Sequence, residues 1–256
     1  MPSEDNHSSA ANVAIVIGAN RGLGRSTALA LAERGVDLII TFRSNRAEAK
    51  DLLKTIGKLG QKAVAFHLDI GAVDTFLGFV KKVQQALRDH WGAERFSYLV
   101  NNTGHVAVGQ TAGLTEADFE GLSDVHLKGV FLLTQHLRPL IADGGRIINV
   151  SSGLTRFTAP DMAASGPMKA ALETLTYHMA KELGPRGITD SATATDFGAS
   201  IIGDNPEMQR DGASITTLGR TGQTDDIGKM IATLLVSDAD RWVNAQRIEV
   251  PGSVKL

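Results

Sequence analysis

The sequence predicts a single-domain α/β fold in which a doubly wound parallel sheet carries helices on both faces. Three observations lead to this prediction. Short strands that are apolar throughout alternate with helical segments, which is the pattern of strands buried on both faces. The first strand runs through a glycine-rich turn into a helix, as in nucleotide-binding folds. The chain has 256 residues and no linker, repeat or low-complexity tract, which suits one large domain.

Hydrophobic periodicity places each element in turn. The expected strands are 12–17, 37–41, 63–68, 98–101, 146–150 and 247–250. The expected helices are 26–34, 45–59, 72–88, 116–141 (continuous or broken in two), 163–183 and one that Thr224 caps. Residues 1–11 are polar, so we expect a flexible tail followed by one domain over residues 12–256.

Composition excludes several classes of function. The net charge of −2 gives no overall field that would attract nucleic acid or an anionic membrane. The chain has no cysteine, which excludes a disulfide scaffold, a thiolate nucleophile and a cysteine metal site, and we expect no metal. No apolar run is long enough to span a membrane, and the N-terminus lacks a signal-peptide core. We therefore expect a cytoplasmic protein.

A phosphate-binding turn is expected between the first strand and the first helix. Glycines let the backbone approach a pyrophosphate closely, and the helix N-terminus offers free N–H groups and a positive dipole end. A merely tight turn would show the same glycines. The expected cofactor-binding residues of the turn are Gly18, Asn20, Arg21, Gly22, Leu23 and Gly24.

The cofactor is expected to be NADP(H). An NAD site needs a carboxylate at the end of the second strand, where it accepts a hydrogen bond from the ribose 2′-hydroxyl. Asp37 stands at the beginning of that strand, whereas Arg43 and Ser44 stand at its end. Arg43 and Arg21 can neutralise a 2′-phosphate, and Ser44 can add a hydrogen bond. The alternative is that both arginines are solvated surface residues.

The GxxxGxG spacing of the turn resembles the short-chain dehydrogenase/reductase family, whose fold is Rossmann-like, and the resemblance covers residues 12–252. Its further motifs follow in order at Asp69–Ile70, 101–104, 145–152, 183–188 and 242–246. The resemblance implies that Asp69, Asn101, Gly104 and Lys169 contact the cofactor and that Ser152 is the catalytic serine. It also implies a homo-oligomer, a tetramer or a dimer, built through long paired helices.

The family's proton donor is missing. The resemblance implies a tyrosine thirteen residues after Ser152, in a YxxxK motif, and that position is Ser165. Lys169 remains, but the nearest tyrosine, Tyr177, is two helical turns further on. Loss of a positioned general acid typically costs about 10²–10⁴-fold in rate, so ordinary carbonyl reduction is disfavoured. The family's asparagine is replaced by His126.

The family's Pro-Gly pair at the end of the sixth strand is also absent. Residues 187–193 run directly into 194–197, so we expect several residues to be deleted there. The sequence leaves open whether a sixth strand survives. The loss would open room beside the nicotinamide for a bulky polycyclic substrate.

One chemistry fits a cofactor site that has no proton donor. An iminium is already a cation, so its reduction gives a neutral amine without a proton. Such a site would hold an anion near the C=N⁺ group, and Asp161, four residues before Ser165, is the candidate. Asp161 is equally well a solvated loop residue or a helix N-cap. His126 either orients the substrate or is a buried, hydrogen-bonded imidazole.

These departures from the family's pattern are similar to those of a small fungal subgroup, the reductase/Diels–Alderases of bridged prenylated indole alkaloids. The resemblance implies reduction of an iminium with NADPH, followed by a sheltered intramolecular [4+2] cycloaddition. The aspartate of that subgroup matches Asp161, whereas its arginine is replaced here by His126.

Three functions therefore remain open. The first is an NADP(H)-dependent reductase of a cationic imine on a small polycyclic molecule in alkaloid secondary metabolism, alone or coupled to cycloaddition. The second is a non-catalytic, degenerate reductase that acts as a binding or scaffold module. The third is an ordinary carbonyl reductase in which His126 substitutes for the acid, and it predicts a rate that follows a pKa near 6.5.

Overall fold

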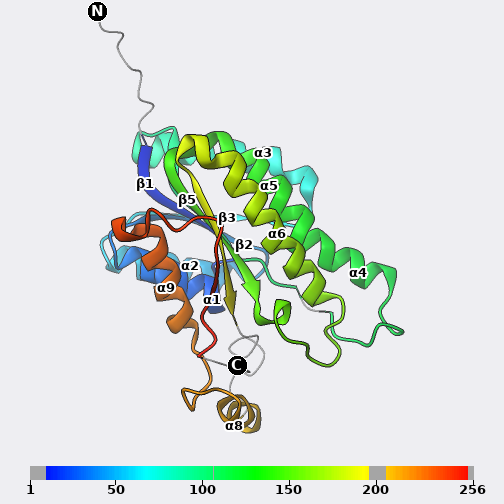
Figure 1. The fold of residues 1–256 in the computed structure, drawn as a ribbon. Coiled ribbons are helices and arrows are strands. Elements are labelled where there is room, and N and C mark those ends of the chain that lie inside the picture. Colours follow the sequence, from blue (N-terminus) through cyan, green and yellow to red (C-terminus); the bar gives the residue numbers. More distant parts are fainter. Residues whose placement is uncertain (1–9, 106, 196–205, 253–256) are drawn as a thin grey trace, which may run out of the picture.

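The computed structural model describes residues 10–105, 107–195 and 206–252. Seven parallel strands form one sheet in the order β3-β2-β1-β4-β5-β6-β7, which confirms the predicted doubly wound sheet (Figure 1). The strand order reverses between β1 and β4, and ligands of such sheets bind at this reversal, beyond the carboxyl ends of the strands. The strands are β1 Ala10–Ile17, β2 Asp37–Phe42, β3 Ala63–His67, β4 Arg95–Asn101, β5 Ile141–Ser152, β6 Thr189–Thr195 and β7 Arg247–Glu249.

Helices cover both faces of the sheet (Figure 1). One face packs against α1 (Gly22–Ala32), α2 (Arg46–Lys58) and α9 (Thr224–Val236). The other packs against α3 (Phe76–Trp91), α5 (Gly129–Leu137) and α6 (Ser165–Leu183). Side chains alternate along each strand, so β1 contributes to both apolar layers.

Shorter helical elements connect these layers. The remaining α-helices are α4 (Glu116–Ser123) and α8 (Pro206–Ser214). A π-helical segment, 124–128, joins α4 to α5. The 3₁₀ turns are η1 (Val73–Thr75), η3 (Arg138–Leu140), η4 (Gly153–Thr155), η5 (Gly184–Arg186) and η6 (Asp238–Asp240).

Several predicted boundaries were wrong. β1 begins at Ala10, because Ala10 and Ala11 pair with β4, so two residues of the expected tail belong to the sheet. The rest of that tail lies outside the described residues. The expected 116–141 helix is interrupted by the π segment and ends at Leu137, since Pro139 follows and cannot extend an α-helix. β5 begins at Ile141.

One further expectation needs correction, and one open question is answered. Thr224 is the first residue of α9 and not its cap: Gln223 is the cap, and its N–H donates to the Asp226 carboxylate at 2.8 Å. A sixth strand is present, because β6 pairs with β5 from Thr189 to Thr195. Asp196 and Phe197 lie outside the described residues.

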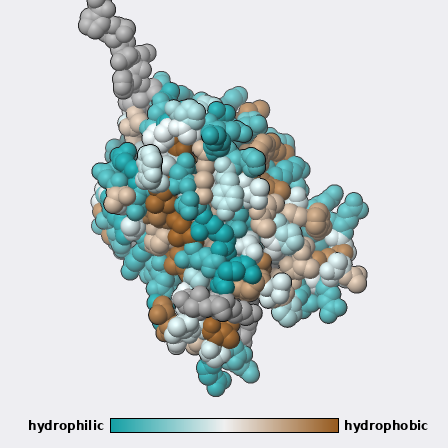
Figure 2. Space-filling model, viewed as in Figure 1, coloured by the Kyte–Doolittle hydropathy of each residue, from teal (hydrophilic) through white to brown (hydrophobic). Residues whose placement is uncertain are grey.

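Polar residues dominate the face shown in Figure 2, and apolar residues gather there in small groups. Shortly after α8, Ile215 and Leu218 are 50% and 69% exposed. α8 lies beyond the carboxyl ends of the strands (Figure 1). Within the described ranges, no helix is both long and apolar enough to cross a membrane.

Candidate active site

The glycine turn after β1 is held tightly by its neighbours. The Gly18 N–H donates to Thr41 Oγ1 at 3.0 Å, and the Asn102 side-chain amide donates to the Gly18 carbonyl at 3.0 Å. Gly18 and Gly22 have φ of +70° and +55°, which side-chain-bearing residues rarely adopt. A Cβ at Gly24 would lie 2.3 Å from the Gly18 carbonyl oxygen. The turn therefore requires its glycines for close packing and leaves the backbone exposed to a ligand.

The N-terminus of α1 is suited to an anion. Its N-cap, Arg21, has an extended backbone and makes no side-chain cap hydrogen bond, so the first-turn N–H groups have no side-chain partner there. Asn20 is buried and donates to Glu48 Oε2 at 2.7 Å, which ties the turn to α2. Leu23 packs against the adjacent apolar core. The turn fits a pyrophosphate, although Asn20 and Leu23 contribute to its shape more than to its exposed surface.

The residues expected to select NADP(H) are exposed at the end of β2. Arg21, Arg43 and Ser44 are all exposed, and neither arginine forms an ion pair with another described residue. Asp37, at the other end of the strand, accepts hydrogen bonds from the Lys62 N–H and from Trp91 Nε1. The charge at the carboxyl end of β2 therefore fits a 2′-phosphate.

Three further residues that are expected to contact the cofactor occupy different environments. Asp69, after β3, is half-buried and accepts from the Gly71 N–H at 3.0 Å. Gly104, after β4, is exposed. Asn101 is fully buried, and its amide donates to Asn149 Oδ1 at 2.8 Å and Thr134 Oγ1 at 3.1 Å. Its side chain joins β4 to β5 and α5, so the expected side-chain contact of Asn101 with the cofactor does not fit this geometry.

Lys169 and two serines meet at the ends of β5 and α6. Lys169 is 5% exposed and donates from Nζ to the carbonyls of Val150 at 2.8 Å and Thr103 at 3.3 Å. Burial lowers the pKa of Lys169 to about 8, against the opposing effect of the Glu173 carboxylate. Ser152 Oγ accepts from the Leu154 N–H at 3.2 Å. Ser165 begins α6 and is buried, with no hydrogen-bond partner for Oγ among the described residues.

Neither of the chain's two tyrosines replaces the missing acid. Tyr98 lies in β4 three residues before its end, half-buried, and burial raises the pKa of its phenol. Tyr177 is 40% exposed, two turns beyond Lys169 in α6. Neither phenol therefore lies at the carboxyl edge of the sheet beside Lys169.

His126 is a neutral imidazole in the π segment. It is 3% exposed, and its Nε2 lies 2.7 Å from the carbonyl oxygen and 3.4 Å from the backbone nitrogen of His105. Nδ1 has no partner among the described residues. Burial, and then the charge of Lys169, lower the pKa of His126 to about 3. A ring with this pKa is uncharged near neutral pH, which argues against His126 as an acid with a pKa near 6.5.

Asp161 is held in an uncommon backbone conformation. Its φ is +61°, and its carbonyl accepts from the Gly109 N–H at 2.9 Å. The half-buried carboxylate makes no hydrogen bond or ion pair with any other described residue. The N-cap of α6 is Ala164, so Asp161 is not that cap. A left-handed conformation in a non-glycine residue costs energy and is found preferentially at functional sites.

Sequence reasoning missed Thr103, Glu173 and Arg247. Thr103 binds Lys169 through its carbonyl, and Glu173 pairs with Arg247 at 2.8 Å beneath the site. A signal for Glu173 was available, because it follows Lys169 by four residues and so lies on the same buried face of the helix. Arg247 lies within the last predicted strand, where a buried charged side chain would need a partner of opposite charge.

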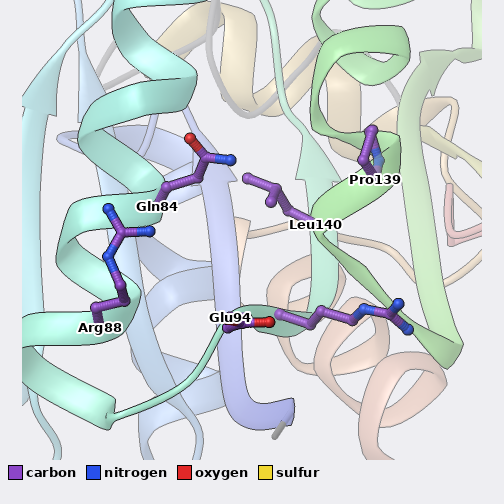
Figure 3. Close-up of a pocket in the computed structure, with 6 residues that line it drawn as sticks. Gln84, Arg88, Glu94, Pro139 and Leu140 are labelled. Carbon is purple, nitrogen blue, oxygen red and sulfur yellow. The ribbon is translucent and has the colours of Figure 1, made fainter. Parts of the chain in front are cut away.

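A pocket of about 290 Å³ lies at the opposite end of the molecule from this site. Figure 3 shows it between α3 and η3, and its lining residues are Gln84, Arg88, Glu94, Arg95, Pro139 and Leu140. Because Arg95 begins β4 and Leu140 precedes β5, the pocket is at the amino ends of the strands. It is thus separate from the cofactor edge. Among the described residues, no cluster of three or more acidic or histidine side chains could hold a metal ion.

Comparison with known proteins agrees with this geometry. A family described as enoyl-(acyl carrier protein) reductase matches residues 18–253. The hydroxynaphthalene reductase-like protein Arp2 of Metarhizium brunneum is 32% identical, with 97% of each chain covered. The structure of the reductase LugOII, which catalyses keto-reduction at C1 during lugdunomycin biosynthesis, matches with a TM-score of 0.88, 32% identity and coverage of 94% and 96%.

The structure of the landomycin C-6 ketoreductase LanV, with bound NADP and rabelomycin, matches with a TM-score of 0.86 and 30% identity, covering 95% of this chain and 97% of LanV. The family match spans most of the sequence, and the relatives are covered almost from end to end. The chain therefore belongs to the short-chain dehydrogenase/reductase family of oxidoreductases.

Proposed function

We propose that the protein is an NADP(H)-dependent reductase of a cationic imine carried by a small polycyclic molecule of alkaloid type. One observation carries this proposal. The phosphate-binding turn and Lys169 are in place, whereas Ser165 stands where the family has its proton-donating tyrosine, and both tyrosines lie elsewhere.

The described residues fit NADP(H). The glycine turn and the open N-terminus of α1 suit the pyrophosphate, and the exposed Arg21, Arg43 and Ser44 suit a 2′-phosphate. The related LanV structure holds NADP. Bound NADPH supplies a hydride. The residues proposed to hold it are Gly18, Arg21, Gly22, Leu23, Gly24, Arg43, Ser44, Asp69, Gly104 and Lys169.

The charges of the site favour a cationic acceptor. A ketone needs a proton when it takes a hydride, and the hydroxyls of Ser152 and Ser165 are too weakly acidic to give one. An iminium needs none. The Asp161 carboxylate, which has no ion-pair partner among the described residues, can stabilise the positive charge of the iminium, and neutral His126 adds no repulsion. The exposed Ile215 and Leu218 beside α8 offer apolar surface for a bulky ring system.

We extend the proposal to a coupled [4+2] cycloaddition. The family's Pro-Gly is absent after β6, where Thr195 occupies the last paired position of the strand. A wider pocket at this place would hold the reduced product in a folded conformation. Chiral chromatography should show one enantiomer of the adduct with the protein and both enantiomers from spontaneous reaction.

The decisive experiment mixes the protein, NADPH and a preformed iminium, and follows loss of absorbance at 340 nm. NADPH should be consumed, and Asp161→Ala should lose most of the rate, about 10²-fold, because the cation loses its counter-charge. Asp51→Ala is the matched control, since Asp51 forms an exposed ion pair with Arg25. No consumption across a panel of cyclic iminium ions would rule the proposal out.

The same assay separates two alternatives. The relatives LugOII and LanV act on ketones, so a ketone reductase is the first alternative, and it would consume NADPH with ketones and not with iminium ions. A non-catalytic binding module is the second, and it would bind NADPH without consuming it.

We also propose a homo-oligomer that pairs α5 and α6 with a second copy. Phe131 on α5 and Tyr177 on α6 are 43% and 40% exposed, which leaves large apolar groups uncovered in the single chain. Sedimentation analysis should give a dimer or a tetramer, and Phe131→Glu should release monomers.

A further inference from the structure

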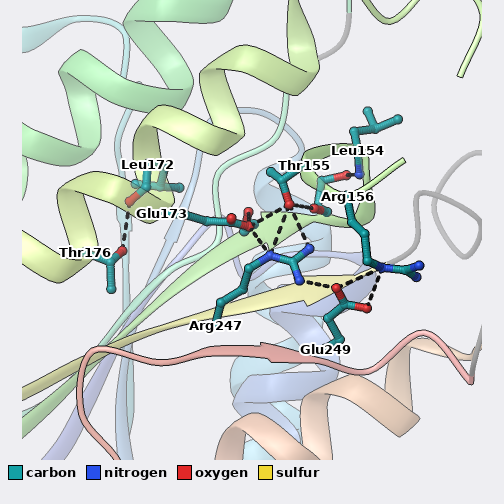
Figure 4. Close-up of polar contacts among 10 residues, drawn as sticks. Leu154, Thr155, Arg156, Leu172, Glu173, Thr176, Arg247 and Glu249 are labelled. Carbon is teal, nitrogen blue, oxygen red and sulfur yellow. Dashed lines mark hydrogen bonds and ion pairs between the residues drawn. The ribbon is translucent and has the colours of Figure 1, made fainter. Parts of the chain in front are cut away.

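Five side chains of alternating charge lead from the edge of the sheet to Lys169. Arg156, after η4, pairs with Glu249 on β7 at 3.0 Å. Glu249 also pairs with Arg247, and Arg247 Nε donates to Glu173 Oε1 at 2.8 Å. Glu173 follows Lys169 by one turn of α6. Figure 4 shows the first four of these residues converging from α6, β7 and the turn after β5.

The middle of this row of charged side chains is buried. The side chains of Arg247 and Glu173 are 19% and 10% exposed. A charge removed from water carries a large free-energy penalty unless it is paired and hydrogen-bonded, so removing either partner alone should destabilise the protein. An apolar pair could fill the same space without this cost. The retained charges therefore point to a role beyond packing.

Glu173 also holds the turn that carries Ser152. Its Oε1 accepts from Ser151 Oγ at 2.5 Å and lies 3.0 Å from Thr155 Oγ1. The Thr155 hydroxyl is also 3.0 Å from the Ser152 carbonyl oxygen, and Arg247 Nη2 donates to it at 2.7 Å. Ser152 is thus fixed from both sides, since Ser151 and Thr155 both contact the same carboxylate oxygen.

We propose that Glu173 and Arg247 are positioning residues of the active site. Glu173 fixes the turn that carries Ser152 and balances the charge of Lys169, and Arg247 holds Glu173 in place from the outermost strand. This inference rests on the proposed role of Lys169 in binding NADP(H), but not on the choice of substrate.

The proposal predicts opposite electrostatic effects at Lys169. Glu173 is the charged group that acts on Lys169 from the same helix. His126 faces it from the π segment and is neutral, and burial raises the pKa of Asp190 on β6. Arg247 lies behind Glu173. Removing the negative charge should lower the pKa of Lys169 from about 8, whereas removing the charge of Arg247 should raise it.

The test compares Glu173→Gln with Arg247→Gln. The pKa of Lys169 is measured in cofactor-free protein from the pH dependence of its competitive acetylation, read by mass spectrometry. NADPH affinity is measured separately by fluorescence titration between pH 7 and pH 10. Arg241→Gln is the control, because Arg241 forms an exposed ion pair with Asp238 on η6, close in sequence to β7.

Glu173→Gln should shift the Lys169 midpoint down by about one pH unit, and Arg247→Gln should shift it up by a smaller amount. At pH 8.5, Glu173→Gln should bind NADPH about tenfold more weakly than the wild type, and Arg241→Gln should match the wild type. Shifts of the same sign in both variants, or no shift in either, would overturn the proposal.

One further variant keeps the test decisive. Arg247→Lys retains the charge and should leave the midpoint unmoved, whereas a purely structural role would make it resemble Arg247→Gln. If Glu173→Gln does not fold, as judged by circular dichroism, the two Arg247 variants decide the outcome. Acetylation needs no substrate, so its result stands even if no iminium is reduced.

Discussion

The two halves of the carboxyl edge differ in what they retain. At β1, α1 and the end of β2, the glycines, the open helix N-terminus and the exposed arginines match what a dinucleotide needs. At β5, α6 and the π segment, Lys169 is present, while Ser165 and His126 stand where the resemblance to the family leads us to expect a tyrosine and an asparagine. Under the proposed function, this difference means that holding a cofactor and delivering a proton are separable, because the first depends on backbone shape and the second on one side chain.

The largest expected effect, on the rate of ketone reduction, comes from restoring a proton-donating tyrosine. Ser165→Tyr should create ketone reduction with NADPH, about 10²–10⁴-fold above the wild type, if the catalytic half has lost only this group. Ser165→Phe is the control, because it fills the same buried position without a phenol. Initial rates with a panel of ketones measure the gain. Equal rates for the two variants would show that more than one position separates the halves.

The next largest effect is expected on NADPH binding, from a substitution in the glycine turn of the cofactor half. Gly24→Ala should weaken NADPH binding about 10–10²-fold, because the new methyl would lie 2.3 Å from the Gly18 carbonyl oxygen and force the turn apart. Gly57→Ala in α2 is the matched control, since its Cβ would meet no heavy atom within 4 Å and alanine favours helices. Isothermal titration gives both affinities. Unchanged binding by Gly24→Ala would place the cofactor elsewhere.

A smaller effect sharpens the choice of cofactor. Arg43→Gln should weaken NADPH binding about tenfold and leave NADH binding unchanged, since only NADPH carries the 2′-phosphate. Arg88→Gln, in the pocket at the amino ends of the strands, should change neither. Fluorescence titration with both dinucleotides measures the ratio. Equal losses for NADPH and NADH would make Arg43 a general contributor to the turn.

The smallest effect at neutral pH concerns His126. Its pKa in the folded chain, about 3, is below the unfolded value of 6.5, so the unfolded chain binds more protons between these values. Stability should therefore fall as the pH drops from 6.5 towards 3. His126→Gln should lose less stability than the wild type between pH 7 and pH 4, as read from urea unfolding midpoints. The reduction rate should show no inflection near pH 6.5.

The sequence predicted the fold because its signals are local, and the prediction of the cofactor half rests on signals of the same kind. Apolar strands, helical periodicity and glycines at fixed spacing depend on neighbouring residues. The catalytic half depends on long-range partners. Asn101 matched a family motif, yet it lies in the interior bonded to Asn149 and Thr134. The Glu173–Arg247 pair joins residues 74 positions apart, and no periodicity in the sequence could indicate it.

Boundaries failed for a related reason. The start of β5 at Ile141 is set by pairing with Phe96 on β4, which overrides the helical pattern that ran to the same residue. Gln223, and not Thr224, is the N-cap of α9, because the Asp226 carboxylate accepts a hydrogen bond from the Gln223 N–H. The π segment gave no sequence signal that we recognised beyond a break within 116–141.

That π segment sets the rotational phase between two helices. It accommodates an extra residue in the turn 124–128, so α4 and α5 present different faces to their surroundings. α5 directs Val130, Leu133 and Leu137 to the sheet, while α4 directs Leu122 to Ala164 and Met168 at the start of α6. Deleting one residue within 124–128 would rotate α4 by roughly 100°. Leu122 would then turn away from the first turn of α6, and the residues around Ser165 would lose this apolar packing.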